Sequence, residues 1–161
     1  MKFTDFILGD AIRVAIKATD KHGVIHEMVQ SLQDAGGIKK TDYEGIVAAV
    51  LKREELGSTG IGSGIAVPHA KHPSVKHPVG CVAVSADGID FDSLDCAKVH
   101  LVFLVISPPD APSEHLRVLE YITRQLKDST FCRFLKQSKT KKEILTLLEE
   151  ADNNIFNMFG K

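Results

Sequence analysis

Apolar residues recur along the chain with two different periods, and the mixture of periods predicts an α/β fold. Helical spacing predicts helices over residues 24–32 and 43–51, the first of them ended by Gly36-Gly37. Alternating or continuous apolar residues predict strands over residues 11–18, 65–69, 80–86 and 99–106. The last of these strands is apolar almost throughout, which predicts a central position covered on both faces.

Three further helices are expected after the central strand. Ser113 is the expected cap of the first, and Ser129 is expected to open the second. Thr140 and Glu143 have capping-box spacing, which predicts the start of the third. The residues expected to face the core from the first of these helices are Leu116, Leu119, Ile122 and Leu126.

Helices and strands mix throughout the chain without a linker or repeat, which predicts one domain. The expected architecture is a mixed β-sheet flanked by helices on both faces, a three-layer α/β/α arrangement. The domain is expected to occupy residues 1–152, and residues 153–161 are expected to form a C-terminal tail.

Composition narrows the class of function. Hydrophobic residues make up 43% and charged residues 25% of the 161 residues, as in an ordinary folded domain. A net charge of −1 argues against a protein that mainly binds nucleic acid or anionic lipid. No apolar run approaches the roughly 20 residues needed to cross a bilayer, and the first residues lack a signal peptide's apolar stretch. We therefore expect a cytoplasmic protein without membrane insertion.

The cysteines and clustered histidines do not form a metal pattern. The three cysteines are widely spaced and lack a C-x-x-C pair, so they are expected to be reduced structural thiols. His69, His72 and His77 lie close together, but Pro73 and Pro78 exclude the helical i, i+4 geometry of a metalloprotease. No metal and no cofactor are expected.

A glycine-rich loop carries the strongest chemical signal in the sequence. Residues 57–64, GSTGIGSG, contain four glycines and lead into a strand that is expected to end at Pro68-His69. Glycines let backbone amides converge on an anion, and hydroxyl groups add donors. The expected phosphate-binding residues are Ser58, Thr59, Gly60, Gly62 and Ser63.

Known nucleotide and nucleophile motifs do not fit this loop. Ser63 occupies the lysine position of a P-loop, and Ile65 stands where the dinucleotide fingerprint needs its third glycine. Neither Ser58 nor Ser63 lies in a G-x-S-x-G nucleophile elbow. The loop therefore predicts an anion cradle rather than a nucleotide site.

His69 is the nucleophile candidate beside this loop. A neutral imidazole is nucleophilic near pH 7, because its ordinary pKa is about 6.5. Arg53 offers a forked, permanently charged donor for phosphoryl oxygens. His115 is expected in the first turn of a helix, where free amide protons and the helix dipole attract a negative group.

The string from Arg53 to His69, REELGSTGIGSGIAVPH, with an E-H-L segment after an apolar strand, resembles the fructose/mannitol class (type 2) of enzyme IIA. These are phosphotransferases of the bacterial phosphoenolpyruvate-dependent sugar phosphotransferase system. The resemblance implies that His69 accepts a phosphoryl group on Nε2 from a histidine-containing phosphocarrier protein, supported by Arg53 and His115. It also implies a mixed sheet with helices on both sides. Ala70 and Ser63 depart from the glycine and asparagine frequent in the family, and both substitutions are small.

The expected function is that of a phosphoryl carrier of the regulatory type, and two alternatives remain. Residues 126–148 resemble the freestanding nitrogen-regulatory branch, in which the protein acts by binding a regulatory target. A freestanding fructose/mannitol-type transport component would instead pass the phosphoryl group to a IIB protein. A non-catalytic binding module with the same fold is the second alternative. Ile61 and Ile65 predict a docking patch for such partners beside His69.

Overall fold

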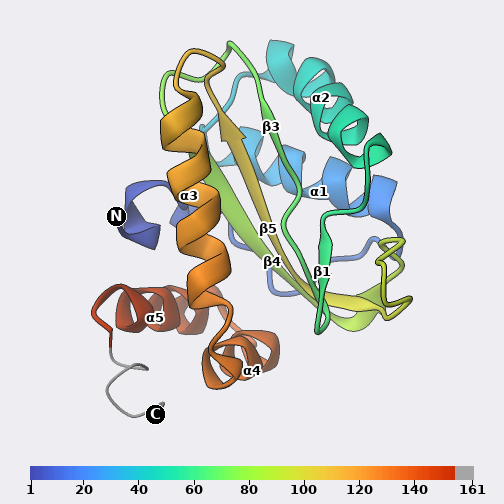
Figure 1. The fold of residues 1–161 in the computed structure, drawn as a ribbon, viewed down its shortest axis with the longest axis vertical. Coiled ribbons are helices and arrows are strands. Elements are labelled where there is room, and N and C mark those ends of the chain that lie inside the picture. The colour runs from blue at the N-terminus through green and yellow to red at the C-terminus, as the bar shows by residue number, and fades with distance from the viewer. Residues whose placement is uncertain (155–161) are drawn as a thin grey trace.

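The structure is a computed structural model that describes residues 1–154. These residues form a mixed five-stranded sheet with helices on both faces (Figure 1), which confirms the predicted three-layer arrangement. The strands are β1 Gly60–Gly62, β2 Ile65–Ala66, β3 His69–Lys71, β4 Val79–Ile89 and β5 Val99–Ser107. Residues 155–161, most of the predicted tail, lie outside the described residues.

Strand β5 is central, as its apolar sequence predicts. It pairs with β4 in antiparallel orientation on one edge and with β2 and β3, in tandem and parallel, on the other. The predicted strand 65–69 is therefore interrupted. Pro68 separates β2 from β3 and lacks the N–H that a continuous ladder would use. As a result His69 begins β3, opposite Val105, instead of ending the strand before it.

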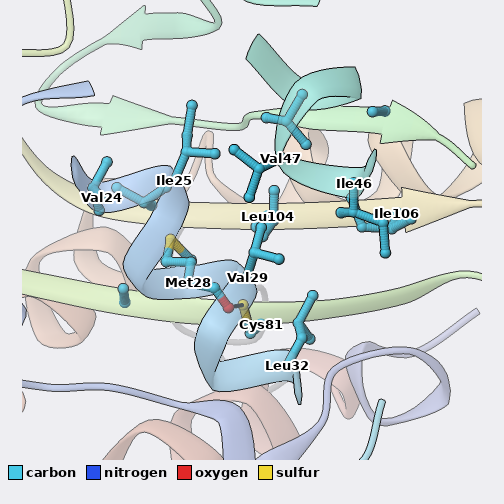
Figure 2. Close-up of a cluster of buried hydrophobic side chains, with 14 of the residues drawn as sticks. Val24, Ile25, Met28, Val29, Leu32, Ile46, Val47, Cys81, Leu104 and Ile106 are labelled. Carbon is cyan, nitrogen blue, oxygen red and sulfur yellow. Dashed lines mark hydrogen bonds between the residues drawn. The ribbon is translucent and has the colours of Figure 1, made fainter. Parts of the chain in front are cut away.

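Helices α1 (Lys21–Asp34) and α2 (Tyr43–Glu55) cover one face of the sheet. Figure 2 shows their apolar side chains packed on Leu104 and Ile106 of β5 and Cys81 of β4. Because successive strand residues point to opposite faces, Phe103 and Val105 instead enter the core on the other side. The central strand is thus buried on both faces.

The second face is covered by α3 (Pro112–Gln125), α4 (Ser129–Gln137) and α5 (Lys141–Asp152), together with the short 3-10 helix Phe3–Asp5. Phe3 packs edge-on against Tyr121, with ring centroids 4.9 Å apart. The Asp152 carboxylate accepts hydrogen bonds from the Phe3 amide, at 2.6 Å, and from the Tyr121 hydroxyl, at 2.5 Å. The first and last elements of the domain are joined at this point.

The predicted strand over residues 11–18 does not form a regular strand. It forms one isolated bridge with β4, Arg13 to Ala83, in which the Arg13 amide donates to the Val82 carbonyl at 3.0 Å and the Arg13 carbonyl accepts from the Val84 amide at 2.8 Å. The Ile16 amide adds a longer hydrogen bond to the Val84 carbonyl, at 3.4 Å. The chain bends at residues 14–15, so Ile12 enters the α3 side of the core while Ile16 packs on the α1 side. Apolar residues do alternate in this segment, but the bend interrupts the regular hydrogen bonding to β4 that a strand requires.

The start and the buried face of α3 differ from the prediction. The helix begins at Pro112, whose fixed φ suits a first helical position, so Ser113 is not the cap. Leu116 is exposed, because the buried face runs through His115, Val118 and Ile122. The other predicted helices are confirmed. Asp128 caps α4, and Thr140 caps α5 by accepting from the Glu143 amide at 3.1 Å.

Candidate functional site

His69 sits at the first position of β3, half-buried, with its ring fixed by the backbone. Its Nδ1 lies 2.8 Å from the Val67 carbonyl oxygen. A carbonyl only accepts hydrogen bonds, so Nδ1 must carry the hydrogen in the neutral ring. The lone pair is therefore on Nε2. The backbone geometry of the Val67–His69 turn thus selects the nucleophilic nitrogen.

His115 provides a second imidazole from the other side. It is buried in the first turns of α3, and its ring centroid lies 5.5 Å from that of His69. The Nδ1 of His115 is 2.6 Å from the hydroxyl of Ser107, the last residue of β5. When Ser107 donates to Nδ1, the ring hydrogen lies on Nε2, where it is available to a phosphoryl oxygen. Strand β5 thus orients His115 just as Val67 orients His69.

A pocket of about 580 Å³ joins these two histidines to the C-terminal part of α2. Four of its residues, Ala49, Lys52, Arg53 and Leu56, follow the i, i+3, i+4, i+7 spacing of one helical face. The remaining lining residues are Glu55, His69, Ala70, Lys71, His115 and Leu119. Arg53, Lys52 and Lys71 give the pocket three cationic side chains.

The electrostatics of the pocket keep both imidazoles neutral. Burial lowers the pKa of His69 below 6.5, and the Arg53 guanidinium acts in the same direction. The hydrogen bond to Val67 and the charge of Glu54 oppose this shift. Burial lowers the pKa of His115 to about 4, helped by His69 and Lys71. The arrangement presents a neutral nucleophile beside permanent cations, which suits attack on a dianionic phosphoryl group.

The structure brings together His69, His115 and Arg53, the three residues expected to carry phosphoryl transfer. The pocket does not include the five residues expected to bind phosphate, because the glycine-rich loop forms a hairpin of β1 and β2. Ser58 donates to the Phe91 carbonyl, Thr59 donates to Glu54, and the Ser63 carbonyl accepts from Lys136. Gly60 and Gly62 belong to β1. A phosphate-binding role for this loop stays a prediction.

Lys52, Lys71 and Ser107 were not identified from the sequence. Lys71 shares the strand face of His69, two residues away, and Lys52 shares the helix face of Arg53. The two-residue period of a strand and the 3.6-residue period of a helix would have indicated these two lysines, once His69 and Arg53 were identified as site residues. Ser107 had no such signal, because its partner His115 lies on a different element.

The predicted docking patch is only partly exposed. Ile65 is buried in β2, whereas Ile61 is half-exposed. Leu56, the C-cap residue of α2, is 84% exposed and lines the pocket, whereas Ile61 of β1 and Ile65 of β2 do not line it. The exposed apolar surface that lines the pocket is therefore at the end of α2 rather than on β1 or β2.

Residues 1–154 contain neither a candidate metal-ion cluster nor a candidate membrane span. No group of three or more histidine, cysteine or acidic side chains there is arranged to hold a metal ion. No helix in the same range is long and apolar enough to cross a membrane. His72, one of the clustered histidines, instead bonds through Nδ1 to the Ser74 hydroxyl at 2.6 Å.

Comparisons with known proteins agree with this geometry. The family model described as "Phosphoenolpyruvate-dependent sugar phosphotransferase system, EIIA 2" matches residues 5–151. The fructose-specific EIIABC component of Bacillus subtilis is 36% identical over 152 residues, which are 94% of this chain and 24% of that protein. A nitrogen regulatory protein of Bradyrhizobium diazoefficiens is 32% identical over 148 residues, 92% of this chain and 95% of that protein. The crystal structure of nitrogen regulatory protein IIA-Ntr from Neisseria meningitidis has a TM-score of 0.80 at 25% identity, covering 89% of this chain and 97% of that one.

Proposed function

Because this chain belongs to the EIIA type 2 family of the phosphoenolpyruvate-dependent sugar phosphotransferase system, a family of phosphoryl carriers, we propose that His69 Nε2 is its phosphoryl acceptor. The donor in this proposal is a histidine-containing phosphocarrier protein. The observation that carries it is the 2.8 Å contact between His69 Nδ1 and the Val67 carbonyl, which leaves the lone pair on Nε2. The three cations and His115 in the same pocket support it.

The transfer step balances without a proton leaving His69. The Nε2 lone pair attacks phosphorus, a new N–P bond forms, and the donor's N–P bond breaks with its electron pair returning to the donor ring. The hydrogen stays on Nδ1 and remains donated to the Val67 carbonyl. Arg53, Lys52 and Lys71 neutralise charge on the phosphoryl oxygens, and His115 donates a hydrogen bond from Nε2. In onward transfer the acceptor's nucleophile bonds to phosphorus, and the His69 N–P bond breaks with its electron pair returning to Nε2.

We propose a regulatory role for the phosphorylated and unphosphorylated forms, with another protein as the target. The likeness to a nitrogen regulatory IIA structure at a TM-score of 0.80 supports this role. A sugar-transport role, with a IIB protein as acceptor, is the second candidate, and the 36% identity to a fructose-specific component favours it. Affinity capture with both forms separates the two roles, because only regulation requires a partner outside the phosphotransfer chain that prefers one form.

The acceptor assignment is tested by labelling with phosphoenolpyruvate and the first two carrier proteins. The wild type should gain one phosphoryl group that is labile in acid and stable in alkali, as a phosphoramidate is. His69→Ala should fold and remain unlabelled. Labelling of His69→Ala, or an alkali-labile group typical of a serine or threonine ester, would refute the proposal.

A further inference from the structure

A buried polar network lies behind the pocket and outside its lining. Lys21, Glu54 and Thr59 are each less than 10% exposed, yet two of them are charged. Removing charges from water is costly, and a buried ion pair is weak evidence for stability by itself. A contribution to stability alone therefore does not account for this buried network.

The Glu54 carboxylate is the centre of the network. One oxygen accepts from Lys21 Nζ at 3.1 Å and from the Thr59 amide at 3.1 Å. The other accepts a short hydrogen bond from the Thr59 hydroxyl. Lys21 is the first residue of α1, Glu54 lies at the end of α2, and Thr59 directly precedes β1. One carboxylate thus fixes three separate elements to one another.

The network is connected to both Arg53 and His69. Arg53 directly precedes Glu54 in the chain, and its guanidinium donates to the Gly57 carbonyl at 2.9 Å. Gly57 lies in the short segment between Glu54 and Thr59, whose two ends are joined by the bonds between these two residues. On the other side, the Thr59 carbonyl accepts from the Val67 amide at 3.0 Å. The Val67 carbonyl in turn accepts the hydrogen bond from His69 Nδ1. Lys21 is thus linked to His69 through one ion pair with Glu54 and through the hydrogen bonds that Thr59 and Val67 make.

We propose that the Lys21–Glu54–Thr59 network positions Arg53 and His69 for phosphoryl transfer, an inference that rests on the proposed function. Its members are positioning residues, because they act through Arg53 and Val67 and do not line the pocket. Small displacements of reacting groups slow an enzymatic step steeply, so a charged network that holds both groups has a kinetic effect beyond its contribution to stability.

Thr59 offers a matched pair of variants. Thr59→Val keeps the shape and removes the hydroxyl bond to Glu54, whereas Thr59→Ser keeps the hydroxyl. The phosphorylation rate should fall roughly tenfold or more in Thr59→Val and return close to wild type in Thr59→Ser. Tyr121→Phe is the control, because it removes another hydroxyl bond to a carboxylate, that of Asp152, and neither residue lines the pocket. It should be destabilised without being slowed.

A second readout separates positioning from direct phosphate contact by Thr59. In the unphosphorylated protein, nitrogen-15 NMR of His69 should show the hydrogen on Nδ1 in the wild type and in Thr59→Ser. This preference should weaken in Thr59→Val and in Glu54→Gln. If Thr59 only contacted phosphate, the NMR signals of unphosphorylated Thr59→Val would match the wild type, and Glu54→Gln would react normally.

The outcomes distinguish this inference from the proposed function. Absence of labelling in the wild type would refute the proposed function, whereas the His69 NMR signals would still report on the network. Wild-type rates and wild-type His69 signals in both Thr59→Val and Glu54→Gln would overturn the positioning role. So would equal slowing of Tyr121→Phe, since the effect would then follow stability alone.

Discussion

The imidazole rings of His69 and His115 lie with their centroids 5.5 Å apart and their planes inclined by 53°. They come from strand β3 and helix α3, and each has its Nδ1 held by a group of the sheet layer, the Val67 carbonyl and the Ser107 hydroxyl. In the proposed reaction the two rings have different roles. His69 attacks phosphorus with the lone pair on Nε2, and His115, with Ser107 donating to its Nδ1, donates a hydrogen bond from Nε2 to the transferred group.

His115 and Arg53 should therefore support transfer without accepting the phosphoryl group. His115→Ala should still be labelled from the phosphorylated carrier, but about 100-fold more slowly, because a preorganised donor to the developing charge is lost. Arg53→Lys should lie between the wild type and Arg53→Ala, since lysine keeps the charge and loses the fork. Rapid-quench labelling measures both rates. Wild-type rates in His115→Ala and Arg53→Ala would remove both residues from the proposed reaction.

The low pKa of His115 should make stability depend on pH. The folded-state pKa is about 4, first because of burial and then because of His69 and Lys71, whereas an unfolded histidine titrates near 6.5. Between these values the unfolded state binds more protons, so the free energy of unfolding falls as pH falls through this window. The full contribution of His115 to the free energy of unfolding, on the order of 3 kcal/mol, is present above pH 6.5.

Urea unfolding at several pH values measures this dependence, with His115→Asn as the matched variant. Asparagine does not titrate in this range, so the slope between pH 6.5 and 4 should be shallower in the variant. Identical slopes in the two proteins would show that His115 is not the source.

Leu56 should contribute to docking of the phosphorylated carrier. It is 84% exposed and lines the pocket. Leu56→Glu should raise the KM for the carrier roughly tenfold, because it removes apolar contact and places a negative charge near the incoming phosphoryl group. Leu94→Glu is the control, at 87% exposure and away from the pocket lining. Equal KM values in these two variants would argue against docking at Leu56.

Ser113 and Thr140, the caps that the sequence predicts for α3 and α5, should respond differently to substitution by alanine. Thr140→Ala removes the hydroxyl that accepts from the Glu143 amide, and should cost about 1 kcal/mol of unfolding free energy. Ser113→Ala should change that free energy by no more than about 0.5 kcal/mol, because Ser113 is exposed and does not cap α3. Chemical denaturation of the two variants tests both values, and a larger loss for Ser113→Ala would contradict the observed helix start.

The sequence by itself determined the elements whose signals are local. Helical spacing over residues 24–32 and 43–51 predicted α1 and α2, and the continuous apolar run predicted β5 as the central strand. These predictions succeed because side-chain periodicity within one element dictates which face can be buried. The motif ending at His69 likewise identified the family, because its residues are contiguous in the chain.

Only the tertiary structure decided how the elements meet. Pro68 splits the strand 65–69, so the pairing of β3 with β5 sets the position of His69. The sequence predicts that the glycine-rich loop binds an anion, and only the structure shows that the Ser58 and Thr59 hydroxyls of this loop donate to the Phe91 carbonyl and the Glu54 carboxylate. The pocket cations and the Ser107 contact depend on residues brought together from different elements. Such contacts have no period along the chain, because they are selected by the packing of the whole core.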